Sequence, residues 1–251
     1  MATSTAALES DQLGPLVEKY GENPLRGFLG AFGVAWSVAV VVFLVSAAIS
    51  AYHRDLAGSL IALALALISG AVAADCFQTS SSSRGVQAEI YERGLSLTRA
   101  GVTTLARWSD IASVEERILY LPVSHTPLRP TCRYRLALAN GQRTQIDAAF
   151  ERAAELGKRV QRMTTKALMP AAVDTYMRGE PVRFGRLSVT QWGIEYEGQR
   201  LLWHAVRQVA IEHGTLTIST GDLPRVWAKI PVAELPNCYL FTTLINAVPR
   251  S

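Results

Sequence analysis

The sequence predicts an α+β membrane protein: a two-helix transmembrane hairpin followed by two blocks of short antiparallel strands, each closed by a C-terminal helix. Three observations lead to this prediction: two long apolar runs near the N-terminus, an alternating pattern after residue 85, and a second copy of that pattern in the C-terminal half. Apolar runs of about 20 residues are long enough to cross a bilayer as helices. Alternation of apolar and polar residues is typical of strands with one buried face.

The two apolar runs cover residues 28–52 and 56–74, and neither contains a charged residue. They are separated by His53-Arg54-Asp55, so we expect two helices joined by a tight loop. A cleavable signal peptide has a basic start and a shorter apolar core, whereas residues 1–27 hold four acidic and two basic residues. We therefore expect both runs to stay in the membrane. Their lack of charge argues against a transporter, whose ion pathway needs polar groups.

Basic residues beside the two runs predict the orientation. Lys19, Arg26, Arg84 and Arg93 lie on the outer flanks, and the loop holds Arg54. Because basic flanks favour the cytoplasmic side, we expect both termini and the soluble domains in the cytoplasm. The expected location is the plasma membrane.

Charge and cysteine content describe the soluble part. Residues 1–76 carry three basic and six acidic residues, a net charge of −3, so the whole-chain charge of +4 leaves +7 on residues 77–251. Cys76, Cys132 and Cys238 are far apart and form no CxxC pair, which fits a reducing compartment. Cys76 lies at the membrane edge, where palmitoylation is an alternative to simple packing.

The first strand-rich block is expected to hold five or six short strands between residues 86 and 146. Asn140-Gly141 predicts a two-residue hairpin turn between strands over Arg133–Ala139 and Gln142–Ile146. Asp147 is the expected N-cap of a helix that ends near Arg178, with Gly179 in the terminating position. Before the hairpin, a short amphipathic turn on the membrane surface is expected over Pro15–Tyr20. We expect five parts: an N-terminal cytoplasmic segment (1–27), the hairpin (28–77), a linker (78–85), a first domain (86–178) and a second domain (179–251).

The two strand-rich blocks look like copies of one another. GLSLTRAG at 94–101 matches RLSVTQWG at 186–193, and the pattern W-x-x-[IV]-x-x-V begins at both Trp108 and Trp203. A bulky ring that recurs at the same place buries much area in each copy. We therefore expect both tryptophans to be core anchors.

These motifs carry a resemblance to a known family. Tyr91-Glu92-Arg93-Gly94-Leu95, followed by Trp108-Ser109-Asp110-Ile111, resembles the strand-turn-strand of bacterial PH-like domains. With Asp147-Ala148-Ala149-Phe150 and the motif GEPVRFG at 179–185, the chain resembles an uncharacterised family of membrane-anchored proteins with a transmembrane hairpin and tandem PH-like domains. The resemblance covers roughly residues 15–248. It implies two PH-like antiparallel β-barrels, each closed by a C-terminal helix, and no activity or catalytic residues.

The sequence contains no motif of an enzyme or a metal site. HExxH, CxxC, GxSxG, GxGxxG and the Walker A loop are all missing. Glu115 and Glu116 are adjacent in a predicted strand, so their side chains should point to opposite faces. We therefore expect a non-enzymatic protein without catalytic residues, cofactor or metal.

Basic residues form the candidate binding surface. Beside the cytoplasmic leaflet they would attract anionic headgroups. The alternative is a solvated helix face partly paired with Glu151 and Glu155. Nucleic acid is not expected, because aromatic residues are not interleaved. The candidate lipid or partner surface consists of Arg152, Lys158, Arg159, Arg162, Lys166, Arg129, Arg133 and Arg135.

The expected function is that of a membrane-anchored adaptor whose tandem domains bind a protein partner, or another copy of the chain, at the cytoplasmic face. One alternative is a sensor of anionic lipid headgroups that uses the basic helix over residues 150–169. Another is an accessory subunit whose hairpin packs into a larger membrane complex. Gly27, Gly30 and Gly33 recur every third residue and favour close helix packing within the hairpin.

Overall fold

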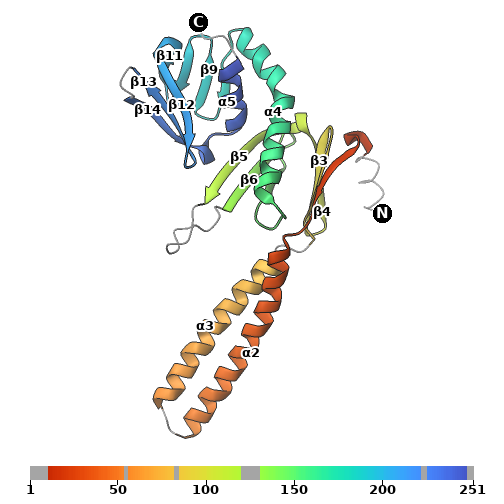
Figure 1. Ribbon diagram of the computed structural model, residues 1–251, viewed down its shortest axis with the longest axis vertical. Coiled ribbons are helices and arrows are strands. Elements are labelled where there is room, and N and C mark those ends of the chain that lie inside the picture. Colours follow the sequence, from red (N-terminus) through yellow and green to blue (C-terminus); the bar gives the residue numbers. More distant parts are fainter. Residues whose placement is uncertain (1–10, 54–55, 82–84, 120–130, 222–224, 248–251) are drawn as a thin grey trace.

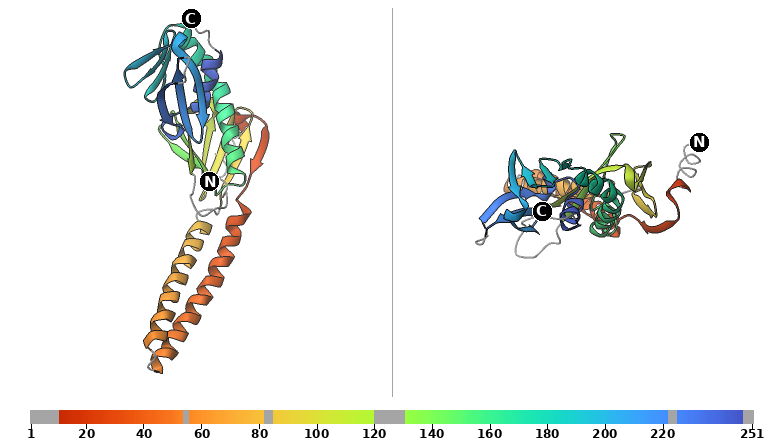
Figure 2. Two further views of the ribbon diagram at one scale, coloured as in Figure 1. Left: turned by 60° about the vertical axis from the view of Figure 1, so that its left-hand side comes forward. Right: turned by 90° about the horizontal axis from the view of Figure 1, so that it is seen from above.

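The computed structural model describes residues 11–53, 56–81, 85–119, 131–221 and 225–247. Figure 1 shows two long helices that project together from one end of a head built of two strand-and-helix units. The left view of Figure 2 shows the same helical pair extending away from both units. The architecture is therefore α+β, with two apolar helices and antiparallel sheets.

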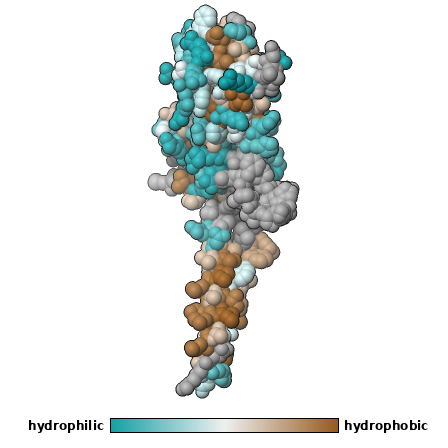
Figure 3. All heavy atoms as spheres, turned by 90° about the vertical axis from the view of Figure 1, so that its left-hand side faces the viewer, coloured by the Kyte–Doolittle hydropathy of each residue, from teal (hydrophilic) through white to brown (hydrophobic). Residues whose placement is uncertain are grey.

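The predicted hairpin is present as α2 (Pro24–Tyr52) and α3 (Leu56–Ser81). Each helix contains a 23-residue stretch, Gly30–Tyr52 and Leu56–Gln78, that is long and apolar enough to cross a membrane. Figure 3 shows apolar side chains along most of the visible surface of the pair. Both helices are longer than predicted. Proline is favoured in the first turn of a helix, where α2 begins, and α3 continues into the predicted linker.

Small residues allow α2 and α3 to approach closely. A Cβ added at Gly33 would lie 3.3 Å from the Cβ of Cys76, and one added at Gly30 would lie 2.8 Å from the Oγ of Ser80. Larger side chains at these positions would push the helices apart. The predicted packing of the glycine stripe against the second helix is thus confirmed at Gly30 and Gly33.

The hairpin is inserted between two strands that pair with each other. β1 (Leu16–Tyr20) precedes α2, and it pairs antiparallel with β2 (Gln87–Tyr91), which follows α3. Tyr20 is fully buried in the core of the first unit, and Nζ of Lys19 lies 3.1 Å from Oε1 of Glu89. The expected amphipathic turn on the membrane surface is wrong, because the backbone of this segment completes a sheet.

The first unit contains two open sheets and a long helix. The first sheet has the order β1-β2-β3-β4 and the second has the order β5-β6-β7. Among the described residues between 86 and 146 there are six strands, which agrees with the predicted five or six. The remaining elements are β3 (Gly94–Arg99), β4 (Val102–Arg107), η2 (Trp108–Asp110), β5 (Ile111–Leu119), β6 (Thr131–Leu138), β7 (Arg143–Ile146) and α4 (Ala153–Met177).

The second unit repeats this order of four strands, a short 3-10 helix, three strands and a helix. Its sheets have the orders β11-β10-β9-β8 and β12-β13-β14. The prediction of closed barrels is wrong, because η2 and η3 separate the two sheets of each unit and no described sheet closes on itself. The elements are β8 (Val182–Phe184), β9 (Leu187–Thr190), β10 (Gly193–Tyr196), β11 (Gln199–Leu202), η3 (Trp203–Ala205), β12 (Val206–Glu212), β13 (Thr215–Thr220), β14 (Arg225–Pro231) and α5 (Cys238–Ala247).

The two repeated tryptophans anchor the two cores in the same way. Trp108 and Trp203 are each 4% exposed. The indole N–H of Trp108 donates to the carbonyl of Tyr91 at 3.3 Å, and that of Trp203 donates to the carbonyl of Thr190 at 3.1 Å. The prediction that both are core anchors is confirmed.

These hydrogen bonds also correct the register of the repeat. Gly94 lies three residues after Tyr91, whose carbonyl accepts from Trp108, and it begins β3, which pairs with β4, the strand before Trp108. Gly193 likewise lies three residues after Thr190 and begins β10, which pairs with β11, the strand before Trp203. Gly94 is therefore equivalent to Gly193. The sequence match of 94–101 with 186–193 is wrong by one strand, because it aligns β3 with β9 and not with β10.

The helix α4 begins later than predicted. Asp147 does not cap it: Oδ1 of Asp147 accepts a hydrogen bond from the backbone N–H of Ala149 at 3.0 Å, and Oδ2 accepts one from Arg99 at 2.9 Å. Residues 147–152 form a turn that holds the start of the hairpin. The backbone N–H of Asn23, the residue before α2, donates to the carbonyl of Ala149 at 2.9 Å.

The helix α4 belongs to both units. Leu156 and Val160 lie in the core of the first unit, and Ala172 and Tyr176 lie in the core of the second. The helix runs through Pro170 without ending there. A single helix thus joins the two cores.

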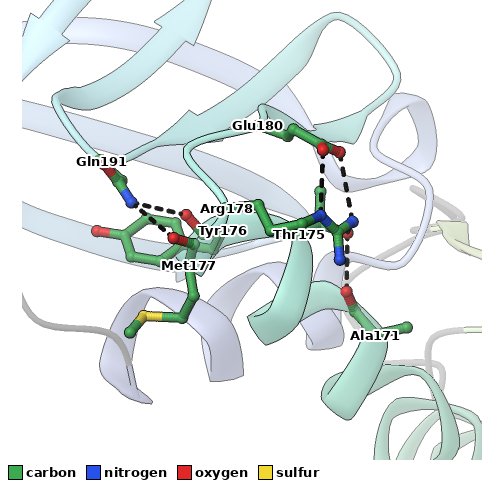
Figure 4. A network of polar contacts seen from close by, with 7 residues as sticks. All are labelled: Ala171, Thr175, Tyr176, Met177, Arg178, Glu180 and Gln191. Carbon is green, nitrogen blue, oxygen red and sulfur yellow. Dashed lines mark hydrogen bonds and ion pairs between the residues drawn. The ribbon is translucent and has the colours of Figure 1, made fainter.

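The end of α4 is held by the second unit, as Figure 4 shows. The side-chain amide of Gln191 donates to the carbonyls of Tyr176 at 3.1 Å and Met177 at 3.2 Å. Gly179 has a φ of +79°, which suits the left-handed position after a helix. The predicted end of this helix is confirmed.

Candidate functional site

Arginines gather on the outer face of the sheet β5-β6-β7. Tyr134 and Leu136 of β6 point into the core, so the residues that alternate with them point outward. Arg117 of β5 is paired with Arg133 of β6. We call this surface the arginine face, and its residues are Arg99, Arg117, Arg133, Arg135 and Arg143.

Every residue of the arginine face except Arg133 lines a groove of about 860 Å³. The charged lining residues are four arginines and Glu115, so the groove is positively charged. A concave surface lined by one sign of charge concentrates ligands of the opposite sign. The lining residues are Arg99, Ser113, Glu115, Arg117, Arg135, Leu136, Ala137, Arg143, Thr144 and Gln145.

Three of these arginines have donor atoms that lack a partner. Nη1 of Arg99 and Nε of Arg117 and of Arg133 are buried, and none has a hydrogen-bond partner among the described residues. Arg99 also donates to Asp147 through Nη2 at 2.9 Å. A buried donor without an acceptor costs free energy. An anion in the groove would offset the repulsion between the neighbouring arginines.

The arginine face begins close to the hairpin. Tyr134 of β6 pairs with Ile146, the last residue of β7. The residue before Tyr134 is Arg133, which pairs with Arg117 of β5. Ile146 leads directly into the turn over residues 147–152, which Asn23 holds immediately before α2. This pair therefore lies at the end of the sheet nearest to the hairpin. In Figure 1, this end of β5 and β6 lies on the lower side of the head, from which the hairpin projects.

The other arginines of the sheet lie farther from the hairpin. Arg135 is paired with Gln145, and Arg143 is paired with Ala137. At about 3.3 Å per residue, the level of Arg143 is roughly 13 Å beyond that of Arg133. The groove thus has a near end and a far end relative to the hairpin.

The predicted basic residues do not form one surface. Arg133 and Arg135 lie on the arginine face, whereas Lys158, Arg159, Arg162 and Lys166 lie on α4, which packs against the core side of the same sheet. Arg129 lies outside the described residues. Sequence reasoning missed Arg99, Arg117 and Arg143. A two-residue turn at Asn140-Gly141 would place Arg143 opposite the buried Leu138, whereas the observed register places it opposite Ala137 on the outer face. Arg99 and Arg117 left no signal in the sequence.

Arg152 has a structural role. It precedes α4 with a φ of +49°, and its guanidinium lies 5.1 Å from the ring centroid of Tyr20. It also forms ion pairs with Glu18 at 3.8 Å and Glu155 at 3.4 Å. These contacts tie β1 to the start of α4, and they confirm the expected pairing with Glu155.

Two of the predicted basic residues on α4 border a different groove. Arg162 and Lys166 line a shallow, mostly apolar hollow of about 630 Å³ between α4 and α5, together with Met169 and Tyr239. A mostly apolar lining offers little to fix an anion. This hollow does not support the predicted basic helix as a headgroup site.

Glu115 and Glu116 point to opposite sides of β5, as predicted. Glu115 lines the outer groove, whereas Oε1 of Glu116 accepts a hydrogen bond from Tyr134 at 3.0 Å and Oε2 accepts one from Gln161 at 3.2 Å. Burial of Tyr134, with the charge of Glu116 beside it, raises the pKa of the phenol above its usual range. Glu116 thus joins α4 to the sheet.

In the part of the chain that the structure describes, no group of three or more His, Cys, Asp or Glu residues could hold a metal ion. The class defined by fold and site is an α+β protein with a hairpin compatible with a membrane anchor and a basic sheet face beside it. Residues 1–250 match the family of unknown function DUF6585, and the chain belongs to this family. Neither a curated protein nor a solved structure matches the chain.

Proposed function

We propose that this chain is a membrane-anchored, non-enzymatic adaptor that presents two PH-like domains at the cytoplasmic face of the plasma membrane. The observation that carries the proposal is the place of the hairpin. Because β1 and β2 pair on its two sides, the head is fixed to both ends of the hairpin and not tethered through a single flexible linker.

Membrane insertion is supported by the length and surface of the hairpin. A span of 23 residues is about 35 Å long as a helix, and the hydrocarbon core of a bilayer is about 30 Å thick. Val38, Val41 and Leu67 are each more than half exposed. Such surfaces are stable in lipid and unstable in water.

The PH-like assignment is supported by the repeated order of elements. Within the described residues, each unit has seven strands in two antiparallel sheets, followed by a helix that packs on the core. In the first unit that helix is α4, and in the second it is α5. A C-terminal helix that covers apolar sheet surface is what the resemblance to PH-like domains implies.

The far end of the arginine face is the proposed partner site. Arg135 and Arg143 are exposed, and they make no ion pair with any described residue. Arginine binds carboxylates through two parallel N–H groups. The proposed partner therefore carries an acidic segment that lies along the groove.

Recovery of partners from native membranes tests this proposal. We expect full-length protein in mild detergent to retain a stoichiometric partner that Arg135→Glu/Arg143→Glu does not retain. The control, Arg183→Glu/Arg207→Glu, changes the charge equally at exposed positions of the second unit and should keep the partner. An unchanged set of proteins in all three samples would contradict the proposed site.

A further inference from the structure

The near end of the arginine face lies at the height of a lipid headgroup layer, if the hairpin crosses a bilayer. Pro24 begins α2, and the apolar stretch begins at Gly30. The six intervening steps of helix rise about 9 Å, and the headgroup layer on one side of a bilayer is about 5–8 Å thick. Asn23 and the turn that it holds therefore lie at the outer edge of that layer.

Arg117 and Arg133 are placed at this edge by the strand register. They lie one residue beyond the level of Ile146, and Ile146 leads into the turn that Asn23 holds. Both side chains are half-buried, and their Nε atoms are buried and have no hydrogen-bond partner among the described residues. Two arginines of neighbouring strands are thus directly paired, and the Nε of each has no acceptor among the described residues.

We propose that Arg117 and Arg133 bind the phosphate of an anionic lipid headgroup in the membrane that the hairpin crosses. A phosphate accepts two parallel N–H bonds from one guanidinium, and a second guanidinium on the neighbouring strand meets its remaining oxygens. Asp147, the acidic residue at the same level, is already bonded to Arg99. The inference rests on the membrane insertion that is part of the proposed function, but it does not depend on a protein partner.

A membrane source of the phosphate is favoured over a soluble one by position. The turn that follows β7 is held beside the leaflet by a backbone hydrogen bond from Asn23, the residue before α2, and the paired arginines lie at the level of this turn. An anionic leaflet attracts basic side chains within about one Debye length of its surface. The local supply of lipid phosphate at this height exceeds that of phosphate in solution.

The test measures the thermal unfolding of the full-length protein in a neutral detergent. The probes are short-chain phosphatidylglycerol, short-chain phosphatidylcholine and inorganic phosphate. Near saturation we expect phosphatidylglycerol to raise the Tm by roughly 5 °C, since a ligand that binds the folded state stabilises it. The variant Arg117→Gln/Arg133→Gln should lose this rise, and Arg117→Lys/Arg133→Lys should keep part of it, because charge remains without the planar fork.

Matched controls decide among the outcomes. Arg183→Gln/Arg207→Gln removes equal charge from the second unit and should respond as the natural protein does. An equal rise with inorganic phosphate would overturn the lipid as ligand, and an equal rise in the Arg117→Gln/Arg133→Gln variant would overturn the site. The absence of any rise in the natural protein would overturn both. Alkaline carbonate extraction separates these results from a failure of the proposed function, since only loss from the membrane pellet would contradict insertion.

Discussion

Asn237 and Val114 exchange two hydrogen bonds, each 2.9 Å long, across the boundary between the two units. The backbone N–H of Asn237 donates to the carbonyl of Val114, and the backbone N–H of Val114 donates to Oδ1 of Asn237. Nδ2 of Asn237 also donates to the carbonyl of Ala112 at 2.9 Å. One asparagine in the left-handed region, with a φ of +54°, thus pairs with β5 as a neighbouring strand would.

Loss of this side chain should weaken the joint between the units. Asn237→Gly keeps the backbone conformation but leaves the Val114 N–H without its acceptor, so we expect a loss of about 1–3 kcal/mol in the free energy of unfolding. Asn237→Ala should cost roughly 1 kcal/mol more, because a Cβ disfavours positive φ. Amide hydrogen exchange reports the change directly. Unaltered protection of Val114 in Asn237→Gly would contradict this role.

Gly157 is required by the fit of α4 on the sheet. A Cβ at this position would lie 2.0 Å from Cε2 of Tyr134, and Tyr134 is fully buried. Alanine is favoured over glycine in a helix by about 1 kcal/mol, but overpacking costs about 1–3 kcal/mol or more. Thermal unfolding of Gly157→Ala should show a lower Tm, and the exposed neighbouring change Lys158→Ala should leave it nearly unchanged. A more stable Gly157→Ala would show that helix propensity dominates.

Glu89 should make the attachment of β1 depend on pH. Burial acts to raise the pKa of its carboxyl, but hydrogen bonds from Tyr91 and Lys19 outweigh this effect and hold the pKa below its usual value. The resulting stabilisation is complete above the pKa of the unfolded chain and is lost as the pH falls through the folded-state pKa. The natural protein should therefore be more stable than Glu89→Gln at neutral pH, and the difference should shrink on acidification. Denaturant unfolding from neutral to acidic pH measures this difference, and a gap of constant size would contradict the assignment.

The close approach of α2 and α3 predicts a cross-link within the hairpin. A Cβ at position 33 would lie 3.3 Å from that of Cys76, close to the usual Cβ separation of about 3.8 Å in a disulfide. Mild oxidation of Gly33→Cys should therefore link positions 33 and 76, as peptide mass spectrometry would detect. Val34→Cys is the control, because Val34 is 56% exposed and should not link. Equal linkage of both variants would indicate a hairpin loose enough to rotate.

The fold could be predicted where the signal is local. The hairpin follows from two uncharged runs, Trp108 and Trp203 recur in the same local pattern, and Asn140-Gly141 marks its turn by residue type alone. Long-range pairing gave no such signal. β1 is five residues long, and its partner β2 lies beyond the whole hairpin, so no periodicity within Leu16–Tyr20 could indicate a sheet.

The candidate site could be predicted only in part for a similar reason. Arg133 and Arg135 were identified as basic residues near one another in sequence, but the level of Arg117 depends on the register between β5 and β6. Residues 120–130 separate these strands and carry no turn signal that fixes the register. The repeat was misaligned because the apolar alternation of β3 resembles that of β9, and the hydrogen bonds of Trp108 and Trp203 supply the correct register.

In the proposed topology, the hairpin crosses the membrane and the head lies on the cytoplasmic side. Labelling of intact cells with a membrane-impermeant maleimide tests it, using single-cysteine variants in which Cys76, Cys132 and Cys238 are replaced by serine. We expect His53→Cys, in the loop of the hairpin, to be labelled, and Arg143→Cys, in the head, to be labelled only after the membrane is opened. Labelling of Arg143→Cys in intact cells would contradict this topology.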